Sequence, residues 1–445
     1  MIKSINHRRG LALGAAAMVA LGGVGLTACS PPGGDVDTDT SAGEVSQDLG
    51  DEDIKLVLYD GAGLKDVDQA LADAFTAQYP NVTIELRLDP DNVQAVNAPR
   101  VLAGENPPDI ARIVALGDIV ADGLLTDLTS FSELYDWSSI PEGQLAQYTA
   151  TEDGVRGSGT QWTVASGFTV TGVYYNKEHA QAVGMTETPT SLEEFEGYLA
   201  QAQAQGLVPI STGNQTGQAA TSFQFLLNNS MGQAGVNDWI FRVPGATIDT
   251  AEGIAAADTT AEWGAEGYFG PDANGMDNNA SLAQFVAGDA LFYNSGNWDA
   301  KSLADQMGDN VAFMPPWPNA EGKVLAMSDP LSNFGIPAKS QNKDAAAAFL
   351  NFLMSDEARA IVVDFGFAPS GAGEVPPVEA GSLNEQVQQA FADLVDSDGQ
   401  VQFIQNASNG ATAAWNAQIQ LLISGQTTGA DMMAAVQQAY EEELD

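Results

Sequence analysis

The sequence predicts an α/β fold, because patterns typical of strands and of helices alternate along the chain. Residues 54–59 form a β-rich run that ends in a glycine turn. Residues 65–79 carry an apolar side chain at every fourth position, which defines one face of a helix. Residues 82–88 then alternate apolar and polar side chains, as a strand does. Together these stretches indicate a βαβ unit and therefore a parallel sheet with covered faces.

The same alternation continues to the C-terminus. Residues 92–103 look helical, and residues 163–175 have the pattern of a strand interrupted by glycines. Thr190 and Glu193 are spaced as a capping box at the start of a further helix. The stretch from residue 51 to residue 445 is too long for one ordinary hydrophobic core. We therefore expect two domains.

The N-terminus has the composition of a secretory signal peptide. Lys3, Arg8 and Arg9 form a basic head, and an uncharged, largely apolar run and small residues follow it. A retained anchor helix is the alternative, but the apolar run is short for a stable membrane span. We expect residues 1–28 to be removed on export.

Residues 29–50 form the next compositional segment. They are rich in Pro, Gly, Ser, Thr and acidic residues and have almost no large apolar side chain. Such a segment cannot bury enough surface to offset its ordering entropy. We expect it to be a flexible tether.

The chain is strongly acidic, with 16 Lys and Arg against 59 Asp and Glu and a formal net charge of −43. Nucleic acid and anionic lipid surfaces would repel such a protein. We therefore expect no nucleic-acid partner and no polyanionic ligand. Solubility of an exported protein, or tolerance of salt, would explain the same acidity.

Two scarce residue types exclude several kinds of chemistry. Cys29 is the only cysteine, so the body lacks disulfides and cysteine metal sites. His179 is the only histidine after residue 28, so a multi-histidine zinc site is excluded and a Ser-His-Asp triad would have to use it. We expect no cofactor and no metal, although a calcium ion among the carboxylates stays open.

The end of the leader, Leu26-Thr27-Ala28-Cys29, resembles a bacterial lipobox. The resemblance implies cleavage before Cys29 and a diacylglycerol on its thiol, which would anchor the protein to the outer face of the cell membrane. Arg8 and Arg9 also suggest twin-arginine export. The choice between this route and the general secretory route stays open.

Five segments of the body resemble, in order, those of the extracellular solute-binding proteins that serve carbohydrate ABC importers. They are AFTAQYPNVTIEL (74–86), AGENPPDI (103–110), VYYNKE (173–178), FVAGDALFYNSGNW (285–298) and NFGIPAKSQNKD (333–344). Residues 159–162 and 328–331 depart from the family pattern. Both departures would face the cleft, so they leave the sugar's identity open.

The resemblance implies a periplasmic-binding-protein-like fold, in which two α/β lobes are joined by a hinge that the chain crosses three times. The crossings would fall near residues 158–162, 328–332 and 395–400. One lobe would contain residues 51–160 and 330–396, and the other residues 161–329 and 397–445. A neutral mono- or oligosaccharide would bind in the cleft between them. The protein would be a monomer without enzymatic activity, and it would deliver its ligand to the transmembrane subunits of a permease.

A sugar has an apolar C–H face and a polar rim, so its site needs aromatic rings beside carboxylates, amides or arginine. Open α/β sheets place such sites at the carboxyl ends of their strands. Asp60, Asn297 and Trp298 are candidates at such positions. Further candidates are Trp162 and Asp329 at expected crossings, Arg112 after the Pro-Asp turn, and Trp263 beside a predicted helix end. Each has a structural alternative: Asp60 as a turn or helix cap, Arg112 as half of an ion pair, and the tryptophans as core residues.

Other functions remain open at this point. Arg112 and Asp60 could in principle hold the two charged groups of an amino acid, so a binder of a non-sugar solute is one alternative. A secreted glycosidase is another, because a retaining enzyme needs only two suitably spaced carboxyl groups. A purely structural lipoprotein is the third.

Overall fold

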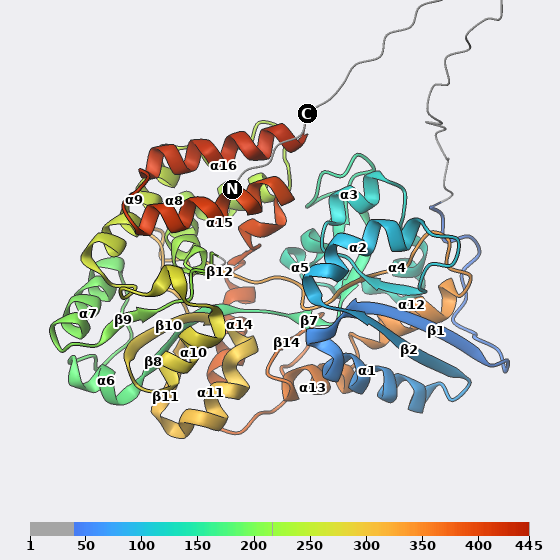
Figure 1. The fold of residues 1–445 in the computed structure, drawn as a ribbon. Helices are drawn as coiled ribbons and strands as arrows, with labels where there is room; N and C mark the ends of the chain where they lie inside the picture. The colour runs from blue at the N-terminus through green and yellow to red at the C-terminus, as the bar shows by residue number, and fades with distance from the viewer. Residues whose placement is uncertain (1–39, 216, 445) are drawn as a thin grey trace, which may run out of the picture. The chain divides into compact units, whose positions relative to one another are not determined.

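The computed structural model describes residues 40–215 and 217–444, so the expected signal peptide and Cys29 lie outside the described residues. Five strands form one sheet in the order β2-β1-β3-β13-β6, and its strands β1 and β2 are labelled in Figure 1. They are β1 (Ile54–Gly61), β2 (Val82–Asp89), β3 (Ile110–Arg112), β6 (Thr163–Ala165) and β13 (Asn333–Gly335). β1 is parallel to β2 and β3, which confirms the expected βαβ unit, whereas β13 is antiparallel to its neighbours β3 and β6.

Four strands form a second sheet in the order β11-β8-β10-β9. They are β8 (Thr171–Asn176), β9 (Val208–Ser211), β10 (Ala290–Gly296) and β11 (Val311–Met314). β10 is parallel to β9 and antiparallel to β8, and β8 is antiparallel to β11. β10 is buried along its whole length. The predicted α/β class is confirmed.

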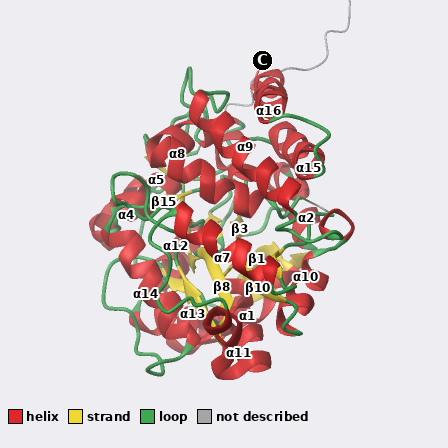
Figure 2. Cartoon of the chain, turned by 90° about the vertical axis from the view of Figure 1, so that its left-hand side faces the viewer, coloured by secondary structure: helices red, strands yellow, loops and turns green. Residues whose placement is uncertain are grey.

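Helices surround both sheets, with the strands on the inside (Figure 2). Those between or after strands of the five-stranded sheet are α1 (Lys65–Gln78), α2 (Asp91–Ala103), α3 (Leu116–Ala121), α4 (Thr129–Tyr135), α5 (Glu142–Tyr148), α12 (Lys343–Phe352) and α13 (Asp356–Asp364). The others are α6 (Lys177–Ala182), α7 (Leu192–Ala204), α8 (Ala220–Ile240), α9 (Ala251–Glu266), α10 (Asn278–Val286), α11 (Ala300–Met307), α14 (Leu383–Asp396), α15 (Asn409–Ile423) and α16 (Gly429–Leu444). None of the helices in the described ranges is both long and apolar enough to cross a membrane.

Two neighbouring segments carry the chain between the sheets. Residues 166–170, which include β7 (Gly167–Phe168), lead from β6 to β8, and residues 328–332 lead from β12 (Ala326–Met327) to β13. They are hydrogen-bonded to each other through the backbone, from Ser166 N to Ser332 O (3.0 Å) and from Leu331 N to Gly167 O (2.8 Å). The passages between the sheets thus lie at residues 166–170 and 328–332, beside the lobe crossings expected near residues 158–162 and 328–332.

The third passage falls earlier than residues 395–400. After α13, β14 (Ala368–Pro369) pairs with β7. α14 then packs against β11 of the four-stranded sheet. The chain has therefore already reached the second sheet before α14 begins, because the apolar face of this helix covers β11.

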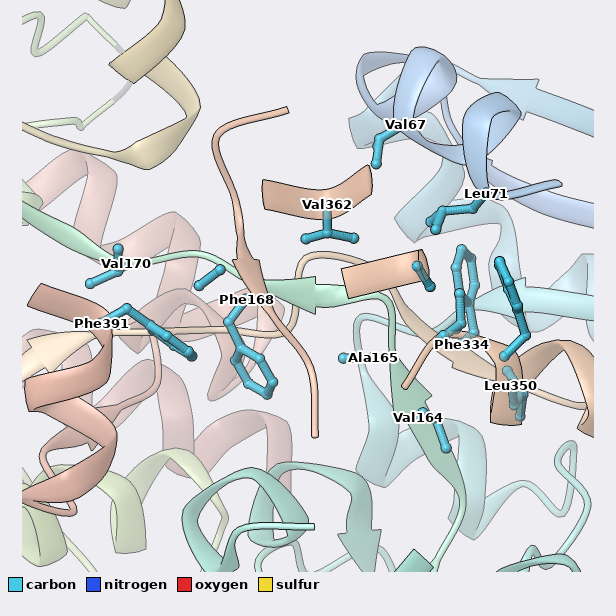
Figure 3. Packing of buried hydrophobic residues seen from close by; sticks show 14 of the residues in the cluster. Val67, Leu71, Val164, Ala165, Phe168, Val170, Phe334, Leu350, Val362 and Phe391 are labelled. Atoms are coloured by element: carbon cyan, nitrogen blue, oxygen red, sulfur yellow. The ribbon is translucent and has the colours of Figure 1, made fainter. Parts of the chain in front are cut away.

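A continuous apolar core passes through the crossings (Figure 3). Phe168 is fully buried there, and its ring stacks on that of Phe391 with centroids 5.8 Å apart. A second core lies around the four-stranded sheet and α8, α9, α15 and α16. The crossings are thus packed segments of the fold.

Residues 40–50, which were expected to belong to the flexible tether, lie against the body. Ala42, Val45 and Leu49 pack on the core of the five-stranded sheet. Ser46 N donates to Asp344 Oδ1 (3.1 Å), and Lys343 Nζ donates to the Ser41 carbonyl (2.8 Å). Three small apolar side chains in an acidic, glycine-containing stretch gave too weak a pattern to predict this packing.

Candidate functional site

A small polar pocket lies where the second crossing meets the ends of β3 and β15 (Gln400–Val401). Its cavity has a volume of about 60 Å³, and its lining is Arg112, Ile113, Val114, Arg156, Asp329, Pro330, Asn333, Gln402 and Asn406. A larger hollow of about 370 Å³ lies between residues 42–54 and the start of α12. We assign the site to the smaller pocket, because the five-stranded sheet, the second crossing and the segment after β15 all line it and several of its buried polar atoms lack partners.

Arg112 ends β3 and points toward the pocket from the five-stranded sheet. Its Nη1 lies 3.5 Å from Oδ1 of Asp60, which ends β1 and is fully buried. Ser332 Oγ donates to the other carboxylate oxygen of Asp60 (2.7 Å), and Gly61 N donates to Oδ1. Burial raises the pKa of Asp60, while Arg112 and these hydrogen bonds oppose the rise. Asp60 therefore orients Arg112 and Ser332 from beneath the pocket.

Arg156 is a second cation in the pocket, and it is only 5% exposed. Its guanidinium lies over the ring of Phe241, 5.1 Å from the centroid, and its backbone N–H donates to the Phe241 carbonyl (3.0 Å). Its Nε and Nη1 have no hydrogen-bond partner among the described residues. Burial lowers the pKa of Arg156 to about 10, so the group is still charged at neutral pH.

Two buried amide oxygens in the same pocket also lack a partner within residues 40–215 and 217–444. They are Oδ1 of Asn333, at the start of β13, and Oε1 of Gln402, just after β15. The amide nitrogen of Gln402 donates to Gln147 Oε1 (2.9 Å), which leaves its oxygen as the unused end. The pocket therefore presents an unpaired cationic donor beside two unpaired acceptors.

Asp329 supplies the carboxylate of the pocket. It accepts hydrogen bonds from the backbone N–H of Phe403 (3.1 Å) and from the side-chain amide of Asn406. Burial raises its pKa to about 6, against the opposing effects of these two bonds and of Arg156 and Arg112.

Trp298 provides an exposed aromatic surface. It follows β10 and is 40% exposed, and it is the one aromatic residue among the exposed large apolar side chains of the described chain. The ring of Phe403 lies beside it, with centroids 6.2 Å apart and planes tilted by 45°. Since Asp329 holds the backbone of Phe403, this aromatic pair is attached to the wall of the pocket.

Three other predicted site residues have structural partners. Asn297 is buried, its Oδ1 accepts from Val170 N (3.2 Å), and its Nδ2 donates to the Phe168 carbonyl (3.3 Å). The indole N–H groups of Trp162 and Trp263 donate to the Ala150 carbonyl (2.9 Å) and to Glu196 Oε1 (2.8 Å). Both rings are buried in separate cores, so neither faces the pocket.

The structure thus brings Asp60, Arg112 and Asp329 together and links Trp298 to Asp329 through Phe403. Sequence reasoning missed Arg156, Asn333, Gln402, Phe403 and Asn406. Arg156 could have been predicted from the sequence, because it is one of few cations and lies just before residues 158–162, where the first crossing was expected. The segment after β15 carried no comparable signal.

Comparison with known proteins gives consistent relationships. A protein of Mesorhizobium japonicum described as a "Probable sugar-binding periplasmic protein" is 24% identical over 235 residues. The match covers 52% of this chain and about half, 54%, of that relative.

Solved structures share the fold over most of the chain. A chitin oligosaccharide binding protein superposes with a TM-score of 0.73 at 20% identity and covers 88% of this chain and 98% of its own. A family 1 extracellular solute-binding protein from Bifidobacterium longum subsp. infantis gives 0.71 at 19% identity, with 88% and 100% covered. At such identities the likeness establishes the periplasmic-binding-protein fold.

The family itself follows from a match over most of the chain. The family described as "Bacterial extracellular solute-binding protein" matches residues 61–360. This stretch contains the four-stranded sheet, every strand of the five-stranded sheet except β1, and three of the segments that line the pocket. Proteins of this family bind solutes, in agreement with the prediction that the chain is not an enzyme. The chain belongs to the bacterial extracellular solute-binding proteins.

Proposed function

We propose that this protein captures a neutral mono- or oligosaccharide in the pocket of Arg112, Arg156 and Asp329 and delivers it to the permease of an ABC importer. The observation that carries the proposal is the set of unpaired buried groups. Arg156 needs an acceptor, whereas Asn333 Oδ1 and Gln402 Oε1 need donors. A hydroxyl group both donates and accepts, so adjacent sugar hydroxyls would satisfy all three.

A ligand with only anionic groups fits the pocket less well. A carboxylate would pair with Arg156 but would leave both amide oxygens without donors, beside the carboxylate of Asp329. These contacts favour an uncharged polyol over an anionic solute.

The aromatic pair of Trp298 and Phe403 supports the same assignment. An exposed indole ring offers a flat apolar surface of the kind that the C–H face of a sugar requires. Phe403 links the pair to the pocket, because its backbone N–H donates to Asp329 and its ring lies beside that of Trp298. A sugar ring on Trp298 would extend from hydroxyls bound near Asp329, which suits a ligand of more than one ring.

A cavity of about 60 Å³ holds only a few water molecules. A sugar would therefore enter after the pocket walls separate, and the walls would close around it. We propose that the two sheets belong to two lobes that move about the crossings. The fraction of closed molecules in the presence of ligand is then set by how much more tightly the closed state binds the ligand than the open state does.

Export and anchoring complete the proposal. Residues 1–28 would direct secretion, and Cys29 would carry the lipid that holds the protein at the outer face of the membrane. The relative from Mesorhizobium japonicum, whose name includes both sugar binding and the periplasm, agrees with this role.

A ligand screen of the purified chain tests the proposal. Chitin oligosaccharides, maltose, raffinose and galactose are compared with glycine, arginine and glutamate by thermal shift and calorimetry. We expect saturable binding of one or more sugars, because a ligand at about 100 times its Kd adds about 2.7 kcal/mol of stability. Binding of amino acids alone would refute the sugar assignment, and steady hydrolysis of a glycoside would identify an enzyme instead.

A further inference from the structure

Asp329 is the residue at which the two neighbouring crossings meet the wall of the pocket. Its backbone N–H donates to Thr169 Oγ1 (3.0 Å), and its carbonyl accepts from the backbone N–H of Thr169 (2.8 Å). Its carboxylate accepts from Phe403 N and from the Asn406 side chain. One residue therefore joins the first crossing, the second crossing and residues 402–406.

Residues 402–406 are a functional part of the pocket. Gln402 and Asn406 line the cavity, and Phe403 lies beside the exposed ring of Trp298. A movement of the crossings that pulled on Asp329 would therefore move two lining residues and one aromatic ring. Ser328 joins the crossings to Val401, just before this segment. The bonds that reach Phe403 and Asn406 from the crossings in the described chain are those of Asp329.

We propose that Asp329 is a positioning residue that couples the two crossings to the pocket wall, so that residues 166–170, 328–332 and 402–406 open and close as one unit. The role of this coupling in transport rests on the proposed function. The coupling itself is a property of the ligand-free protein, and it can be measured without any sugar.

The charge on Asp329 sets the direction of a pH effect on this unit. Arg112 from β3 and Arg156 from the segment before β5 (Thr160–Gln161) face the carboxylate and lower its pKa, but burial outweighs them and raises it to about 6. Residues 166–170 and 402–406 contain no titratable side chain. Opening would expose the carboxylate to water and return its pKa to about 4. A proton therefore favours the closed unit, and opening becomes easier as the pH rises through 6.

Hydrogen–deuterium exchange of the ligand-free protein tests the coupling. Asp329→Ala removes both accepted bonds, and we expect exchange at residues 166–170 and 402–406 to accelerate together, about tenfold or more. In the wild type, exchange corrected for its intrinsic rate should be slower in both segments at pH 5 than at pH 7.5. In Asp329→Asn, which cannot ionise, this pH difference should disappear.

Asp109→Ala is the matched control. Asp109 is also a buried carboxylate, and it accepts from Val57 N, Ser340 Oγ and Asn342 Nδ2, all outside the crossings. We expect its loss to leave both segments and their pH profile unchanged. The inference would be overturned if Asp329→Ala accelerated exchange only at residues 328–332, or if Asp109→Ala had an equal effect. It would also be overturned if the corrected exchange rates of the wild type did not change between pH 5 and pH 7.5. Failure of the sugar screen would leave these readouts untouched.

Discussion

Arg156, Asn333 and Gln402 each bury a polar atom that no residue of the described chain satisfies. Buried polar groups in proteins are nearly always hydrogen-bonded, and an unpaired one costs about 1–3 kcal/mol. Three such groups around one cavity indicate that the pocket is arranged for a ligand, to the detriment of the free protein's stability. Arg156 shows this most clearly, because it carries a charge.

Replacement of Arg156 by Met should separate binding from stability. We expect the affinity for the sugar found in the screen to fall at least tenfold, because the pocket loses its unpaired donors. The melting temperature should stay the same or rise, because the substitution removes an unpaired buried cation and keeps the contact with Phe241. Calorimetry and thermal unfolding measure the two effects.

Arg359→Met provides the comparison for this variant. Arg359 is 2% exposed, but its guanidinium donates to the carbonyls of Ser370, Gly373 and Glu374. Its loss should lower the melting temperature and leave the affinity nearly unchanged. A destabilised Arg156→Met variant with normal affinity would contradict our assignment of Arg156.

At the scale of elements, α3 and the end of α8 approach each other although they flank different sheets. Arg242, just after α8, forms an ion pair with Asp118 of α3, and its Nε donates to the Ala407 carbonyl (2.9 Å). Arg242 has a left-handed backbone, with φ of 63°, which is uncommon for a residue with a side chain. The contacts with Asp118 and Ala407 therefore stabilise the left-handed backbone of Arg242.

Asp118→Asn should loosen this contact. Since Asp118 is 42% exposed on its side chain, we expect a stability loss of only about 1 kcal/mol or less. The radius of gyration of the ligand-free protein should nevertheless increase, and small-angle scattering measures it. Lys301→Met breaks the exposed Lys301–Asp305 pair within α11 and should change nothing. An unchanged radius in Asp118→Asn would show that the pair does not hold the two elements together.

The sequence predicted regular elements better than contacts between distant segments. The βαβ unit was visible because its apolar periods are local. The helix start near residue 190 was recognised one residue early: Ser191 is the N-cap, and its Oγ accepts from Glu194 N (3.2 Å). Thr190 donates to Glu194 instead. Both residues fit the capping pattern, so the local sequence could not choose between them.

The candidate site was predictable only in part. Asp60, Arg112 and Asp329 lie at strand ends, where open sheets bind ligands, and they do meet. Trp162, expected at a crossing, and Trp263, expected beside a helix end, were also candidates, but their neighbours enclose them. Whether an indole faces a pocket or a core depends on residues far away in the chain, which the local sequence does not reveal.

At the scale of the whole molecule, the formal charge of −43 is the dominant electrostatic property. Repulsion among so many carboxylates opposes the compact state, and most of the ion pairs identified in the described chain have exposed partners. Raising NaCl from about 20 mM to about 500 mM should therefore raise the melting temperature by several degrees, because salt shortens the Debye length from about 20 Å to about 4 Å. A melting temperature that falls with salt would show that attractive pairs dominate instead.

The small size of the pocket has a kinetic consequence. If sugars enter only a wider conformer, the observed association rate is the intrinsic rate scaled by the fraction of molecules that are wide enough to admit them. A substitution that weakens the contact of Asp118, which lies outside the pocket, would enlarge that fraction and quicken entry. The same substitution would shorten the residence time of the sugar, so the two rate constants should rise together while their ratio changes little.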